Sequence, residues 1–116
     1  MSTVNTMVEE IREQVAAELD LLHTIEADKS AATARSNGQE AFIARYRVAG
    51  QVVASLNRNK ELLKGEKKVN DKLASGLGIE TKTLSNFKRV SDLDEQQAVS
   101  SFNLLGLQGT IDTCKE

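Results

Sequence analysis

The 116-residue sequence contains no proline and no tryptophan, and it has only one cysteine (Cys114) and one histidine (His23). A single cysteine excludes an internal disulfide and a multi-cysteine zinc site, and it is compatible with a cytoplasmic location. A single histidine excludes metal motifs built on two imidazoles. No apolar run reaches the roughly 18 residues that a membrane-spanning helix needs. We therefore expect a non-enzymatic protein without a metal, a cofactor, a membrane partner or a small-molecule ligand.

Only four residues are aromatic, which disfavours a β-sandwich. Apolar residues recur instead at steps of three and four, as in amphipathic helices. We predict an all-α fold of four to five helices, with a long amphipathic helix over residues 1–36. A helical domain over residues 37–105 follows, and residues 106–116, with two glycines, are expected to form a flexible tail.

The long first helix carries an apolar stripe for which two partners remain open. At about 1.5 Å per residue, thirty helical residues would span about 45 Å, which is long for a domain of this size. The stripe packs either on the second helix of the same chain or on a second copy of the protein. We predict a homodimer in which the stripe consists of Val4, Val8, Ile11, Val15, Leu19 and Leu22.

The most informative stretch is the twenty residues from Asn70 to Arg89, NDKLASGLGIETKTLSNFKR. Two helices that cross after a tight turn need a small residue at the crossing, a residue that tolerates positive φ at the turn, and apolar residues that seal the helices together. The stretch meets each requirement through Leu73, Ala74, Leu77, Gly78, Ile79, Leu84 and Phe87.

This stretch resembles the helix-turn-helix family of DNA-binding proteins. The matching residues are Leu73-Ala74, Leu77-Gly78-Ile79 and Thr83-Leu84-Ser85, and the likeness covers about a sixth of the chain. Glu80 departs from the family, which often has a serine or threonine here as the cap of the second helix. An acidic side chain at this place suits phosphates poorly, unless the cap shifts to Thr81.

The resemblance implies that the second helix of the motif enters the major groove of DNA. Residues on its outer side would then read base edges, and lysines around the motif would contact the phosphate backbone. The implied base-reading residues are Thr81, Lys82, Ser85, Asn86 and Arg89. The implied backbone contacts are Lys64, Lys67, Lys68, Lys72 and Lys88.

The net charge of −2 disfavours nucleic acid as a partner, but the charges are unevenly distributed. Residues 57–90 carry nine basic and four acidic groups, whereas residues 1–40 and 91–116 are both acidic. Because salt screens charges beyond about 8 Å, the basic centre matters more to a phosphate than the total does. The charge pattern therefore favours DNA binding at the motif.

We predict a sequence-preferring double-stranded DNA-binding protein, a small transcriptional regulator acting as a repressor, of bacterial, phage or mobile-element origin. Two alternatives remain open. The chain would otherwise be a DNA-recruiting subunit of a phage packaging or plasmid partition machine. In the second alternative it is a protein-binding adaptor or inhibitor that uses its acidic ends.

Overall fold

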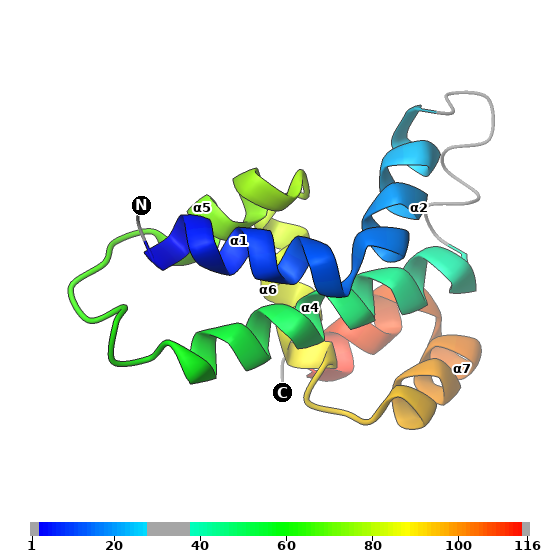
Figure 1. The fold of residues 1–116 in the computed structure, drawn as a ribbon. Coiled ribbons are helices and arrows are strands. Elements are labelled where there is room, and N and C mark those ends of the chain that lie inside the picture. The colour runs from blue at the N-terminus through cyan, green and yellow to red at the C-terminus, as the bar shows by residue number, and fades with distance from the viewer. Residues whose placement is uncertain (1–2, 28–37, 115–116) are drawn as a thin grey trace.

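The computed structural model describes residues 3–27 and 38–114, and all regular structure in these ranges is helical (Figure 1). The all-α prediction is confirmed. No helix in the described ranges combines the length and the apolar character needed to cross a membrane. The six helices are α1 (Thr3–Gln14), α2 (Ala16–Ala27), α4 (Gln39–Arg58), α5 (Val69–Leu77), α6 (Thr81–Val90) and α7 (Glu95–Cys114).

Over residues 3–27, the predicted long first helix is two helices, so the described residues form six helices instead of the predicted four to five. The chain changes direction at Val15, between α1 and α2 (Figure 1). Val15 is itself buried. The bend lets α1 pack against α5 while α2 packs against α4. Residues 28–36 of the predicted helix lie outside the described residues.

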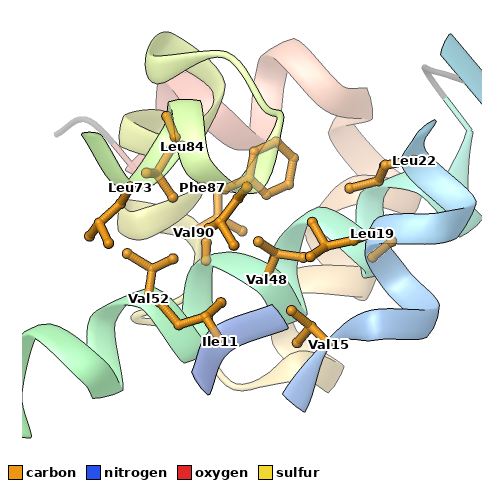
Figure 2. Close-up of a cluster of buried hydrophobic side chains, with 14 of the residues drawn as sticks. Ile11, Val15, Leu19, Leu22, Val48, Val52, Leu73, Leu84, Phe87 and Val90 are labelled. Carbon is orange, nitrogen blue, oxygen red and sulfur yellow. The ribbon is translucent and has the colours of Figure 1, made fainter. Parts of the chain in front are cut away.

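The apolar stripe assigned to a dimer interface lies in the core of the single chain. Its side chains are all buried, and they join one cluster with residues of α4, α5 and α6 (Figure 2). The stripe therefore packs within the chain, and its apolar surface is not available to a second copy. This corrects the dimerisation role of Val4, Val8, Ile11, Val15, Leu19 and Leu22.

Helix α4 forms the centre of the fold, with α1 and α2 on one side and α7 on the other (Figure 1). Val48 and Val52 of α4 point into the shared core. Phe42 of α4 contacts two rings, with centroid distances of 5.4 Å to Phe87 of α6 and 4.6 Å to Phe102 of α7. Three of the four aromatic residues thus fasten α6 and α7 to the central helix.

The flexible tail predicted from residue 106 onward is wrong for the described residues. Helix α7 reaches Cys114, and it is kinked at Gly106, where φ is 77°. Glycine tolerates this positive φ, so the chain can turn and resume a helix. Thr110 and Ile111 are then buried, and the Thr110 hydroxyl donates to the Gly106 carbonyl at 2.8 Å. The two glycines bend this segment and do not prevent it from folding.

The close approach of α1 to α5 predicts that Gly76→Ala destabilises the protein. A Cβ at Gly76 would lie 2.8 Å from Cγ2 of Val8, a branched side chain with little freedom. Overpacking costs about 1–3 kcal/mol, against a helix-propensity gain of about 1 kcal/mol. Urea unfolding should show a lower midpoint, and the penalty should shrink in a Val8→Ala background. A raised midpoint would contradict the tight packing.

Candidate nucleic-acid interface

The turn between α5 and α6 is short and consists of Gly78, Ile79 and Glu80. Gly78 has φ 73° and ψ 32°, as the sequence predicted for a residue that must tolerate positive φ. The Ile79 amide donates to the Ala74 carbonyl at 3.0 Å, and the Gly78 amide donates to the Ser75 carbonyl at 3.2 Å. These bonds satisfy two carbonyls in the last turn of α5, so the chain leaves the helix in a fixed direction.

The apolar residues of the motif attach both helices to the core. Ala74 is fully buried, as expected for the small residue at the crossing, and Ile79 is partly buried beside the cluster. On α6, Val90 extends the buried face beyond the two residues that the sequence identified (Figure 2). The remaining motif residues are at most 2% exposed: Leu73, Leu77, Leu84 and Phe87.

The five predicted base-reading residues all lie on α6, outside its buried face. Lys82 and Arg89 are exposed, and their spacing of seven residues puts them on one side of the helix. Thr81, Ser85 and Asn86 are half-buried. Because the opposite side of α6 is buried in the core, these five polar side chains form a row that faces away from the core in one fixed orientation.

The start of α5 lies beside this row. Thr81 and Ser85 of α6 line a shallow depression together with Lys68, Asn70 and Asp71 at the start of α5. Lys68 is exposed and has φ 56°, a left-handed conformation that is uncommon for a residue with a Cβ. The fold therefore brings one predicted backbone-contacting lysine next to two predicted base-reading residues.

The other predicted backbone contacts have different surroundings. Lys67 is exposed. Nζ of Lys64 lies 2.8 Å from Oε2 of Glu61, and Nζ of Lys72 lies 3.1 Å from Oε2 of Glu66. Such surface ion pairs contribute about 0–1 kcal/mol, so these ammonium groups can exchange their carboxylate for a phosphate at little cost.

Lys88 has a structural partner that the sequence did not indicate. Its Nζ donates to Asn70 Oδ1 at 3.0 Å, which links α6 to the start of α5. Burial lowers the pKa of Lys88. Lys88 is one of the predicted contacts to the DNA backbone, whereas the sequence predicts no role for Asn70. The sequence gives one weak indication of this hydrogen bond: Asn70 is the first residue of the motif stretch and lies eighteen residues before Lys88.

Glu80 occupies the cap position of α6 without acting as a side-chain cap. Its backbone is extended, with φ −72° and ψ 140°, and no side-chain hydrogen bond caps the helix. Thr81 is the first helical residue, so the alternative of a cap shifted to Thr81 is wrong. Glu80 instead lines a cavity together with Arg45 of α4 and Glu26 of α2.

His23 contacts the turn from α2. Its Nε2 lies 3.3 Å from the Leu77 carbonyl oxygen, and it would lie 2.8 Å from a Cβ added at Gly78. This contact joins residues 54 positions apart in the sequence, and helical spacing does not indicate it. Within residues 3–27 and 38–114, no cluster of three or more histidine, cysteine or acidic residues has the geometry to hold a metal ion.

The comparisons with known proteins assign no family to the chain. No protein-family model matches it, and no curated protein or solved structure matches it with significant similarity.

The conformation of Gly78 predicts opposite effects for two glycine substitutions. Gly78→Ala should destabilise the protein by about 1–2 kcal/mol, because alanine is strained at positive φ. Its Cβ would also crowd the His23 ring. Gly50→Ala is the control: Gly50 lies within α4 and a Cβ there meets no atom within 4 Å. It should stabilise by about 0.5–1 kcal/mol. Urea midpoints that rise for both variants would contradict the left-handed turn.

Proposed function

We propose that this protein binds double-stranded DNA through α6 and acts as a small transcriptional repressor. The observation that carries the proposal is the two-sided character of α6. Leu84, Phe87 and Val90 fix one side in the core, while Lys82 and Arg89 are exposed on the other. The major groove, about 12 Å wide, admits a helix presented in this way.

The chemistry of the outer side of α6 suits base edges. Asn86 has the amide group that bonds adenine in a bidentate manner, and Lys82 or Arg89 can donate to guanine. Seven residues of helix separate Lys82 from Arg89 by about 10 Å along the axis, close to three base pairs at ~3.4 Å each. One helix of this length therefore suffices to read a short half-site.

The start of α5 supports phosphate binding next to this row. Lys67 and Lys68 are exposed there, and the amide end of a helix attracts anions. A phosphate near Thr81 would meet the exposed Lys68 at the start of α5, since both residues line the same depression, which the acidic Glu66 and Asp71 also border. Occlusion of a promoter needs nothing beyond such binding. A homodimer that reads two half-sites stays a prediction, through a surface other than the buried stripe.

The direct test is selection of bound fragments from random genomic DNA, followed by affinity measurements on an enriched site. Asn86→Ala and Arg89→Ala should each cost about 1–3 kcal/mol at their own base position and relax specificity there. Lys67→Ala should weaken binding to all sequences alike and reduce the salt slope by about one unit. Each effect follows from whether the lost group contacts a base or a phosphate.

Arg47→Gln is the matched control, because it also removes an exposed positive charge. Arg47 is on α4 and pairs with Glu18 and Glu95, on helices other than α5 and α6. Its loss should leave the affinity for the enriched site nearly unchanged. Binding without sequence enrichment would favour the packaging or partition alternative over a repressor. The absence of any salt-sensitive binding would contradict the proposal.

A further inference from the structure

A cavity of about 90 Å³ lies between α2, α4 and the start of α6. Three charged side chains border it, each from a different helix or turn: Glu26 of α2, Arg45 of α4 and Glu80 before α6. The other lining residues are mostly apolar and belong to the core faces of these helices. We infer that Arg45 is a positioning residue, which holds the Glu80 carboxylate on the core side of α6 and away from DNA phosphates.

The register of α6 supports this position for Glu80. Leu84 and Phe87 follow Glu80 at four and seven residues, so Glu80 stands at the head of the side of α6 that carries the buried residues, although Glu80 itself is exposed. Lys82 and Arg89 lie on the other side. An acidic residue directly before a DNA-reading helix is thus compatible with phosphate binding, provided that its carboxylate stays beside Arg45.

Arg45 has the charge and the surroundings for this role. It is half-buried on α4, and its guanidinium keeps its positive charge at any physiological pH. Burial lowers the pKa of Arg45, and the nearby carboxylates of Glu26 and Glu80 oppose that shift. One arginine therefore shares the cavity with two carboxylates of opposite charge. Glu26 lies on α2, so α2 contributes a second carboxylate to this cavity.

This inference rests on the proposed DNA binding, and it adds a specific consequence. Without Arg45, the exposed Glu80 side chain is free to turn toward solvent and toward the phosphates. A carboxylate about 7 Å from a phosphate in water weakens binding about threefold by simple repulsion. The repulsion should fade as salt is raised, because both charges are then screened.

The test is a double-mutant cycle on DNA affinity, measured with a labelled 20-base-pair duplex at low salt. The four proteins are the wild type, Arg45→Met, Glu80→Gln and the double variant. If the charges of Arg45 and Glu80 act on DNA independently, Glu80→Gln raises the DNA affinity equally in the wild type and in the Arg45→Met variant. If Arg45 positions Glu80, Glu80→Gln leaves the DNA affinity of the wild type almost unchanged and raises that of the Arg45→Met variant about threefold. Arg45→Lys should retain much of the wild-type behaviour.

The controls distinguish a loss of folding from a change in the position of the Glu80 carboxylate. Arg47→Gln removes an equal charge from the same helix, and Glu80→Gln in that background should behave as in the wild type. If Arg45→Met lacks a cooperative unfolding transition, Arg45→Gln replaces it in the cycle. Equal gains in all backgrounds, with a wild type that binds DNA, would overturn the positioning role alone. A wild type that does not bind DNA would overturn this inference together with the proposed function.

Discussion

Burial of one side of α6 against the central helix α4 determines which side chains the protein presents to solvent. Phe42 lies between Phe87 and Phe102, so the same ring that fixes α6 also fixes α7. Leu84 and Val90 extend this contact along α6. Because the buried side cannot rotate away without exposing these residues, the polar side has one orientation. The proposed reading of DNA depends on that orientation.

Helices α1 and α2 stabilise this arrangement through contacts with α5 and with the turn that follows it. Helix α1 packs closely on α5 at Gly76, and α2 contacts the turn through His23. The hydrogen bonds of Gly78 and Ile79 set the direction in which the chain leaves α5. The three charged residues Glu26, Arg45 and Glu80 line one cavity near the start of α6 and are not among the predicted base-reading residues of that helix.

Much of this could be predicted from the sequence, because local requirements limit residue choice. Gly78 was identifiable since few residues tolerate positive φ, and the buried side of α6 followed from helical spacing. The bend at Val15 was not, since neither glycine nor proline marks it and only packing explains it. The helix after Gly106 was missed because glycines usually indicate a loop. The hydrogen bond of Lys88 to Asn70 and the cavity that Arg45 shares with Glu26 and Glu80 bring together residues distant in sequence, which spacing alone does not reveal.

The central claim, that α6 and the start of α5 form the DNA-binding surface, is tested most directly by nuclear magnetic resonance. Isotope-labelled protein would be titrated with a short duplex, and amide shifts would be mapped onto the helices. If these helices bind DNA, the largest shifts concentrate in residues 67–72 and 81–89 and weaken as salt is raised. Shifts centred on the acidic α1 and α2 surfaces, or no shifts at all, would contradict it.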